Sequence, residues 1–343
     1  QRAEAFLEDP PSGRGAKKKR LEAVEEPITA FLRELHELRV LDPACGSGNF
    51  LYIALQTLKD FEHEVVTFAE EVGVPAMRFL GPRQFHGIEI NPFARALASM
   101  VVWIGYLQWN RANGLSNAQR PILEPLENIR LHDALMNEDG SEYEWPEAEF
   151  IIGNPPFIGG KRLRSDLGDA YVDRLFEAYD EQVAREADFV CYWFEKARKM
   201  IAAGGTRRAG LISTNSIRGG ANRRVLDRIK ETGDIFMAWS DEEWILEGAA
   251  VRVSIVGFDD GSGSERTLNG EPVSSINSSL TSGVDVNLAV TLVENSGLSF
   301  MGTTKGGSFD IPGELARSWL HLPNPSGRSN VEVLRPWVNG LDI

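Results

Sequence analysis

The stretch LRVLDPACGSGNFLYIAL, residues 38–55, joins a buried β-strand to an α-helix through a glycine-rich corner. Gly46 and Gly48 let the backbone approach a ligand closely, and the first turn of the helix offers free N–H groups to an anion. A dinucleotide-binding fold would favour a third glycine where this chain has Leu51, which counts against a nicotinamide cofactor. No G-x-x-x-x-G-K-[ST] phosphate loop occurs either. The corner therefore predicts a different small-molecule site at the end of the first strand.

Predicted strands and helices alternate along the chain on the C-terminal side of this corner. Buried strands are expected at residues 38–42, 84–90, 128–134, 149–154, 208–214, 234–240 and 251–258. Segments with helical spacing of apolar residues separate most of them, which predicts an α/β protein with a parallel, doubly wound sheet. The last two strands lie close together without a clear helix between them. We therefore expect a mostly parallel, seven-stranded sheet whose last strand is antiparallel.

Three regions are expected along the 343 residues. Residues 1–37 form a helical segment with Pro27 near a helix start, and residues 38–260 form the α/β core. Residues 261–343 form a loop or hairpin extension, because this region begins with a run rich in Ser, Gly and Asn. The chain starts on Gln1 and ends in an apolar stretch, so we expect it to be the core of a longer polypeptide.

Composition argues against several classes of protein. No apolar run approaches the ~20 residues that a membrane span needs. Cys45 and Cys191 form no disulfide framework and fit a reducing cytosol. The formal net charge of −14 argues against a nucleic-acid binder that uses its whole surface, but not against a local basic groove near 14–20, 159–164 or 218–224. We expect no membrane partner and no metal site.

Three successive predicted strands end in a carboxylate, at Asp42, Glu89 and Asp133. Ligands of open α/β sheets lie at the carboxyl ends of the strands. Asp42 would repel a pyrophosphate but attract an ammonium group, Glu89 could accept hydrogen bonds from ribose hydroxyls, and Asp133 could accept one from an adenine amine. S-adenosylmethionine carries all three groups. Each acid alone could instead cap a helix or a turn, but their order behind the glycine corner favours this cofactor.

The stretch FIIGNPPFIG, residues 150–159, places a rigid corner where another buried strand reaches the surface. One interpretation is a stiff turn. The other is a pocket that grips a planar amino group.

Together, DPACGSGNF (42–50) and NPPF (154–157) resemble the motifs of DNA methyltransferases that modify adenine. With LISTNSI (211–217) and GAAVRVSIVGF (248–258), they are similar to the methylase region of MmeI-like (type IIL) fused restriction–modification enzymes. The resemblance covers residues 38–260 well and implies a class I methyltransferase fold of the Rossmann-like type. It also implies S-adenosylmethionine as cofactor, S-adenosylhomocysteine as product and adenine in double-stranded DNA as substrate.

The same resemblance implies further parts of a longer protein. A nuclease region would precede the methylase, and residues 261–343 would lead toward a target-recognition domain. Such a protein is expected in the bacterial cytoplasm, associated with the nucleoid through DNA.

The resemblance also assigns site residues, motif by motif. The cofactor loop comprises Asp42, Pro43, Ala44, Cys45, Gly46, Ser47, Gly48, Asn49 and Phe50. Further cofactor contacts fall on Glu89, Ile90, Asp133, Ala134 and, within ADFVCYWF, Asp188. The catalytic tetrapeptide consists of Asn154, Pro155, Pro156 and Phe157. The basic cluster that follows it offers Lys161, Arg162 and Arg164 to DNA phosphates, with a solvated loop as the alternative.

The chemistry of amino methylation explains such a corner. An adenine amino nitrogen is a poor nucleophile because its lone pair is delocalised into the ring. If the Asn154 side-chain carbonyl and the Pro155 backbone carbonyl each accept one amino hydrogen, the lone pair becomes available for in-line displacement. The prolines hold these carbonyls in place, and Phe157 offers a face on which an extruded base can stack.

Other interpretations stay open at this point. Protein methyltransferases that modify glutamine and some ribosomal-RNA adenine methyltransferases use a similar corner. A non-catalytic binding module of the same fold is disfavoured by the intact Asp42 and Asn154, and a nicotinamide oxidoreductase is disfavoured by Leu51. Trp239 and Trp244 either line a target pocket or belong to the core. We expect residues 1–343 alone to bind the cofactor but to methylate DNA poorly.

Overall fold

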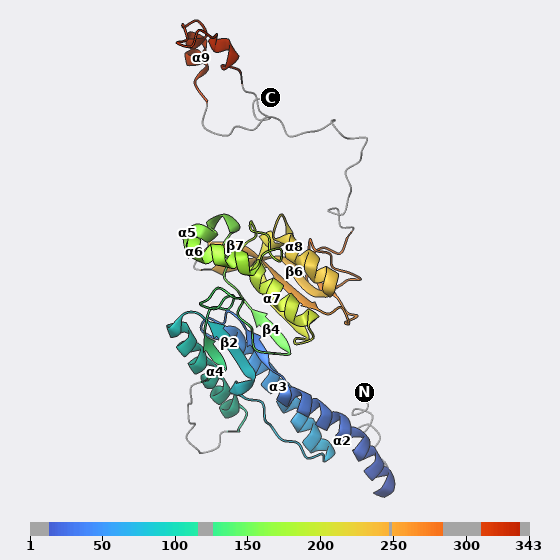
Figure 1. Ribbon diagram of the computed structural model, residues 1–343. Coiled ribbons are helices and arrows are strands. Elements are labelled where there is room, and N and C mark those ends of the chain that lie inside the picture. The colour runs from blue at the N-terminus through green and yellow to red at the C-terminus, as the bar shows by residue number, and fades with distance from the viewer. Residues whose placement is uncertain (1–13, 116–125, 247–248, 284–309, 337–343) are drawn as a thin grey trace. The chain divides into compact units, whose positions relative to one another are not determined.

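The computed structural model describes residues 14–115, 126–246, 249–283 and 310–336 (Figure 1). The chain divides into two compact units, Gln1–Val286 and Asn287–Ile343. The described part of the second unit contains the helix α9 (Gly313–Leu320) and a 3₁₀ turn at Asn330–Glu332. All predicted site residues lie in the first unit. The boundaries expected after residues 37 and 260 stay predictions.

Within the described part of the first unit, nine strands form one sheet in the order β3-β2-β1-β4-β5-β7-β6-β8-β9. They are β1 (Val40–Asp42), β2 (Phe85–Glu89), β3 (Ile129–Leu131), β4 (Phe150–Gly153), β5 (Arg208–Thr214), β6 (Asp234–Leu246), β7 (Ala249–Asp259), β8 (Thr267–Leu268) and β9 (Glu271–Pro272). Strands β1 to β5 pair in parallel, and β7 is antiparallel to both β5 and β6. The doubly wound, mostly parallel sheet with a reversed seventh strand is confirmed. The two-residue strands β8 and β9 extend it beyond the expected seven, because the predicted hairpin segment pairs with β6.

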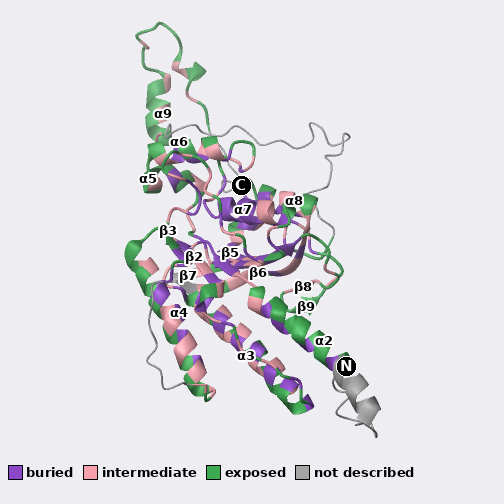
Figure 2. Ribbon diagram, turned by 60° about the horizontal axis from the view of Figure 1, so that its bottom comes forward, coloured by how far each residue is buried: buried purple, intermediate pink, exposed green. Residues whose placement is uncertain are grey.

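Helices cover both faces of this sheet. The described helices of the unit are α2 (Arg14–Glu37), α3 (Asn49–Val72), α4 (Pro92–Ala112), α5 (Leu163–Leu167), α6 (Asp169–Ala178), α7 (Cys191–Ala202) and α8 (Arg223–Thr232). None of them is both long and apolar enough to cross a membrane. Figure 2 shows buried positions alternating with exposed ones along α3, as expected of a helix that packs on one side only.

Neighbouring strand residues contribute to separate cores on the two faces. Val40 packs with Phe85 and Ile129 in the core that includes α3 and α4. Leu41, the next residue, packs in the core that includes α5, α6, α7 and α8. Successive strand side chains point to opposite faces, so the apolar run of β1 is buried on both. The sheet edge at the strand ends, and not its faces, is therefore left for ligands.

Helix α2 begins at Arg14, so Pro27 lies in its interior and not near its start as expected. A proline inside a helix removes one backbone hydrogen bond and usually bends or breaks the helix. Tertiary packing offsets this cost, since Val24, Ile28 and Leu32 form a core cluster with residues of α3. The expectation was wrong because it weighed local propensity and not this contact.

A buried ion pair anchors the segment that leads into β2. Glu62 on α3 is buried, and its Oε1 accepts the backbone N–H groups of Phe79 (2.7 Å) and Leu80 (2.8 Å). Its Oε2 lies 3.2 Å from the Nζ of Lys59, which is also buried and donates to the Leu80 carbonyl. Two charges taken out of water are tolerated only with such partners.

Replacing Glu62 with alanine should therefore leave the Lys59 ammonium buried without its counter-charge. We expect Glu62→Ala to lower the free energy of unfolding by about 3–5 kcal/mol, measured by urea denaturation. The exposed residue Glu64 on the same helix provides the control, and Glu64→Ala should change the free energy by less than about 0.5 kcal/mol. Similar losses in the two variants would contradict a stabilising role for the buried pair.

Candidate active site

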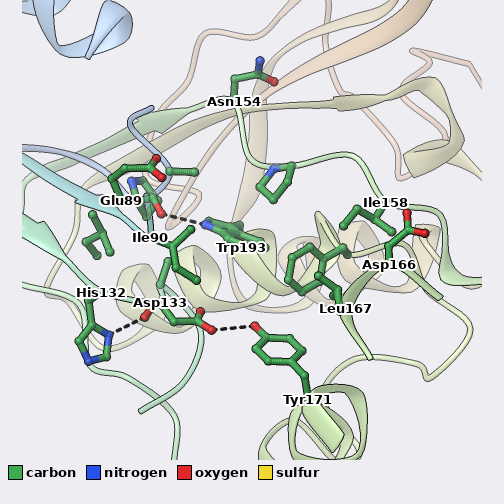
Figure 3. A pocket seen from close by; sticks show the side chains of 16 residues that line it. Glu89, Ile90, His132, Asp133, Asn154, Ile158, Asp166, Leu167, Tyr171 and Trp193 are labelled. Atoms are coloured by element: carbon green, nitrogen blue, oxygen red, sulfur yellow. Dashed lines mark hydrogen bonds between the residues drawn. The ribbon is translucent and has the colours of Figure 1, made fainter. Parts of the chain in front are cut away.

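A cavity of about 580 Å³ lies at the carboxyl ends of the parallel strands (Figure 3). This volume is typical of sites for cofactors and small ligands. Among its lining residues are predicted site residues from four segments, namely Pro43, Ala44, Glu89, Ile90, Asp133, Ala134, Asn154 and Pro156. They meet because parallel strands that are neighbours in the sheet end at the same edge.

Asp42, the last residue of β1, is buried next to this cavity. Its Oδ1 accepts the N–H of Ala44 at 3.0 Å, whereas its Oδ2 is buried without a hydrogen-bond partner among the described residues. Burial raises the pKa of Asp42 to about 7, the hydrogen bond from Ala44 opposes this shift, and the nearby Glu89 charge adds to it. A nearby cation would stabilise the ionised form of this buried carboxylate.

Glu89 ties the glycine corner to the end of β2. Its Oε2 accepts the N–H of Gly46 at 2.9 Å, and its Oε1 accepts the N–H of Asn91 at 2.7 Å. A carboxylate has about four acceptor positions, so each oxygen retains capacity for a ligand hydroxyl. The other corner residues, Cys45, Gly46, Ser47, Gly48, Asn49 and Phe50, are not among the residues that line the cavity. Of the predicted cofactor loop, only Pro43 and Ala44 are among the residues that line the cavity.

Asp133 lies with Tyr171 at one end of the cavity, and Asn154 lies at the other (Figure 3). The Oδ1 of Asp133 accepts the N–H of Leu135 at 2.8 Å, and its Oδ2 accepts the hydroxyl of Tyr171 at 2.9 Å. Burial, followed by the Asp133 charge, raises the pKa of Tyr171, which therefore stays a proton donor. Sequence reasoning missed Tyr171, because nothing in the pattern of α6 indicates which of its side chains reaches Asp133.

Asn154 opens the predicted catalytic tetrapeptide, Asn154–Phe157, which is called the catalytic corner below. Its Oδ1 is buried and has no hydrogen-bond partner within the described ranges. Pro155 is buried, and Pro156 is exposed and lines the cavity. Phe157 is half-buried and packs against the core that contains α5–α8, so it is not part of the cavity wall. The corner thus presents an unused carbonyl oxygen beside the cavity.

Asp188 lies apart from the cofactor-side residues. Its Oδ1 accepts the N–H of Gly160, and its Oδ2 accepts hydrogens from Ser216 and Asn222. The structure does not place it in the cavity wall, and its carboxylate is already used by the chain. Phe189 and Trp193 line the cavity in its place. The motif ADFVCYWF therefore lies near the cavity, but Phe189 and Trp193 line it and Asp188 does not.

Trp193 connects this segment to the glycine corner. Its indole Nε1–H donates to the backbone carbonyl of Pro43 at 3.1 Å, and the side chain is buried. The bond joins residues 150 positions apart, so sequence reasoning could not have found it.

Two of the predicted phosphate-binding residues, Arg162 and Arg164, form ion pairs with aspartates of this chain. Arg162 forms an ion pair with Asp166 (2.8 Å), and Arg164 forms ion pairs with Asp169 (2.9 Å) and Asp173 (2.8 Å). Both arginines are exposed, as is Lys161. Exposed pairs contribute only about 0–1 kcal/mol, so a phosphate can replace the carboxylate.

The two tryptophans considered for a target pocket lie on β6. Trp239 packs on the turn between β8 and β9, where a Cβ added to Gly270 would lie 3.3 Å from its ring. Trp244 is half-buried, and neither ring lines the cavity.

Comparison with known proteins gives consistent matches. Residues 16–269 match the family model described as MmeI, DNA-methyltransferase domain. DNA methyltransferase A of Bacillus subtilis is 30% identical over 245 residues, which are 66% of this chain and 27% of that protein. Adenine-specific methyltransferase PglX of Streptomyces coelicolor is 24% identical over 222 residues, which are 52% of this chain and 17% of that protein.

A solved structure of the type IIL restriction–modification enzyme MmeI in complex with DNA is also similar. Its TM-score is 0.62 at 29% identity, over 79% of this chain and 39% of that one. The chain therefore spans less than half the length of each relative described here.

The buried carboxylate of Asp42 should reduce stability at high pH. Its folded-state pKa of about 7 lies above the ordinary value of 3.8, so ionisation costs more in the folded than in the unfolded protein. We expect Asp42→Asn to be as stable as the wild type near pH 4 and more stable above pH 7, by up to about 4 kcal/mol. Urea denaturation of the ligand-free protein at the two pH values measures this, with the exposed Asp180→Asn as control. Loss of stability in Asp42→Asn at about pH 8 would contradict the burial argument.

Proposed function

Because the chain belongs to the family of the MmeI DNA-methyltransferase domain, we propose that it methylates the exocyclic amino group of adenine in double-stranded DNA, with S-adenosylmethionine as methyl donor. The observation that carries the proposal is the buried Oδ1 of Asn154 beside the cavity, which has no hydrogen-bond partner in the part of the chain that the structure describes. Adenine is our choice because asparagine opens the corner and because the relative in Streptomyces coelicolor is named adenine-specific.

The residues at the strand ends fit the polar groups of this cofactor. The buried Oδ2 of Asp42 lacks a partner among the described residues and suits the ammonium group. Glu89 retains acceptor capacity for ribose hydroxyls, and Asp133 retains it for the adenine amine. Ile90, Phe189 and Trp193 supply the apolar wall for the ring, and the bound cofactor supplies a methyl group on a sulfonium.

The catalytic corner then acts on the target base. The Asn154 Oδ1 and the Pro155 carbonyl accept the two amino hydrogens of adenine, which directs the nitrogen lone pair toward the methyl group. The corner needs no strong base, because the amino proton becomes acidic once the nitrogen is alkylated. Its prolines limit backbone motion, so the acceptors are aimed before the base arrives.

The target base must leave the duplex to reach this corner. Amino groups inside DNA are paired, and enzymes that act on them extrude the nucleotide. We keep Phe157 as the candidate stacking residue, with its ring fixed by contact with the core. Lys161, Arg162 and Arg164, next to the corner, are our candidates for the flanking phosphates.

The proposal includes the cellular role of the enzyme. The modification would belong to a restriction–modification system in the bacterial cytoplasm. Nuclease and target-recognition regions on the full-length polypeptide are part of this proposal.

The proposal is tested by Asn154→Ala. We expect methyladenine in DNA from cells that express the full-length protein, and a loss of about 10²–10³-fold or more in the variant. Nucleoside mass spectrometry measures the product, and Asn110→Ala on α4 is the matched control. The affinity for S-adenosylhomocysteine should change less than about twofold in Asn154→Ala. DNA that stays unmodified with the wild type would favour a glutamine or ribosomal-RNA substrate, to be assayed with release factor and ribosomes.

Cofactor affinity should depend on the ionisation of Asp42. Since the pKa of this carboxyl is raised to about 7, a cationic ligand must displace a proton at lower pH. We expect the affinity for S-adenosylhomocysteine to fall about tenfold per pH unit below pH 7 and to level off above it. Calorimetric titrations at about pH 6, 7 and 8 measure the slope. Asp42→Asn should bind more weakly and without this slope, and a wild-type affinity independent of pH would contradict the assignment.

A further inference from the structure

The Asp188 carboxylate joins three segments that are distant in the sequence. Its Oδ1 accepts the backbone N–H of Gly160 at 2.9 Å, three residues beyond the catalytic corner. Its Oδ2 accepts the hydroxyl of Ser216 and the amide Nδ2–H of Asn222, both at 2.7 Å. Ser216 follows β5, and Asn222 precedes α8. One carboxylate thus connects the loops after β4 and β5.

Asn222 returns a hydrogen bond to the same residue. Its Oδ1 accepts the backbone N–H of Asp188 at 2.7 Å, and its side chain is buried. Two side chains that each donate or accept in one fixed direction form a pair with a defined orientation. The backbone around Asp188 is therefore held on both sides.

The loop that continues from the catalytic corner is fixed at two further points. The N–H of Phe189 donates to the carbonyl of Ile158 at 2.8 Å. A Cβ added to Gly160 would lie 2.2 Å from the backbone oxygen of Glu186, so only glycine fits there. Residues 158–160 thus lie directly against the turn that leads into α7.

We propose, on the basis of the proposed function, that Asp188 is a positioning residue for the catalytic corner and does not contact the cofactor. Its carboxylate holds the loop that leaves Phe157, so the Asn154 and Pro155 carbonyls keep their aim. The cavity is lined by its neighbours Phe189 and Trp193, whereas Asp188 is not among the lining residues.

Exchanging the amide and the carboxylate between positions 188 and 222 tests this positioning role. In Asp188→Asn, an amide NH₂ replaces one carboxylate oxygen. At the Oδ2 position it meets the NH₂ of Asn222, and the Asn222 and Ser216 donors lose their acceptor; at the Oδ1 position the Gly160 N–H loses its acceptor. In Asn222→Asp, two carboxylates meet. The double variant restores one amide and one carboxylate with the central bond reversed, and Gly160 again meets an acceptor. Ser216, whose Oγ lies 3.2 Å from Asn222 Nδ2, can then donate to the carboxylate at 222.

Single-turnover methylation of unmethylated plasmid DNA by the full-length protein tests the proposal. We expect each single variant to lower the rate constant at saturating cofactor about 10–100-fold. The dissociation constant for S-adenosylhomocysteine should change less than about twofold. The double variant should return to within about threefold of the wild-type rate, and Asp180→Asn should keep it.

Three results would overturn the proposal. The single variants could keep the wild-type rate, or Asp188→Asn could weaken cofactor binding with the rate at saturation unchanged, or the double variant could stay as slow as the slower single variant. A wild type that modifies no DNA would count against the proposed function instead. The positioning role is then judged by hydrogen exchange at the Gly160 amide, which should quicken in both single variants and recover in the double variant.

Discussion

The candidate site depends on two buried side-chain oxygens, the Asp42 Oδ2 and the Asn154 Oδ1, that have no hydrogen-bond partner among the described residues. Asp42, Asn91 and Asp133 each stand at or just after a strand end, and each accepts the N–H of the residue two positions later. Asn154 stands in the same place after β4, but the residue two positions later is Pro156, which has no N–H. The usual local turn is therefore unavailable, and the Asn154 Oδ1 is left for a ligand.

Buried oxygens without a hydrogen-bond partner lower the stability of the folded protein, so other interactions in the fold must compensate for this loss. A buried acceptor without a partner costs about 1–3 kcal/mol, and an ionised one more. The two apolar cores on either side of the sheet supply the compensating stability, and rigid neighbours keep the oxygens from turning toward other donors. The Trp193–Pro43 bond and the Asp188 network serve this second purpose, because they hold the backbone on which the oxygens sit.

Sequence patterns predicted the parts of the molecule whose causes are local. The strands, the glycine corner and the carboxylates at or near the ends of β1, β2 and β3 depend on a few neighbouring residues, and the sequence pattern predicted them. The predicted end of β3 was wrong, because this strand ends at Leu131 and Asp133 follows it by two positions. The pairing of Arg162 with Asp166 was also within reach of sequence reasoning, since residues four positions apart lie on the same face of a helical turn. Tyr171 and Trp193 could not be found, because their roles depend on how helices pack against the sheet. The position of Pro27 was misjudged for the same reason.

The sheet order brings the two halves of the candidate site together. Strand β4 pairs with β1, so the chain reaches the catalytic corner beside the carboxylate that ends β1. A Cβ added to Gly153 would lie 2.7 Å from the Asp42 Oδ1, so a side chain there would push the two loops apart. Glycine at this position keeps the buried acid and the Asn154 amide on adjoining backbones. In the proposed reaction, a cation held by Asp42 would thereby be fixed relative to Asn154 through a few stiff bonds, and positioning of this kind requires no movement when a base arrives.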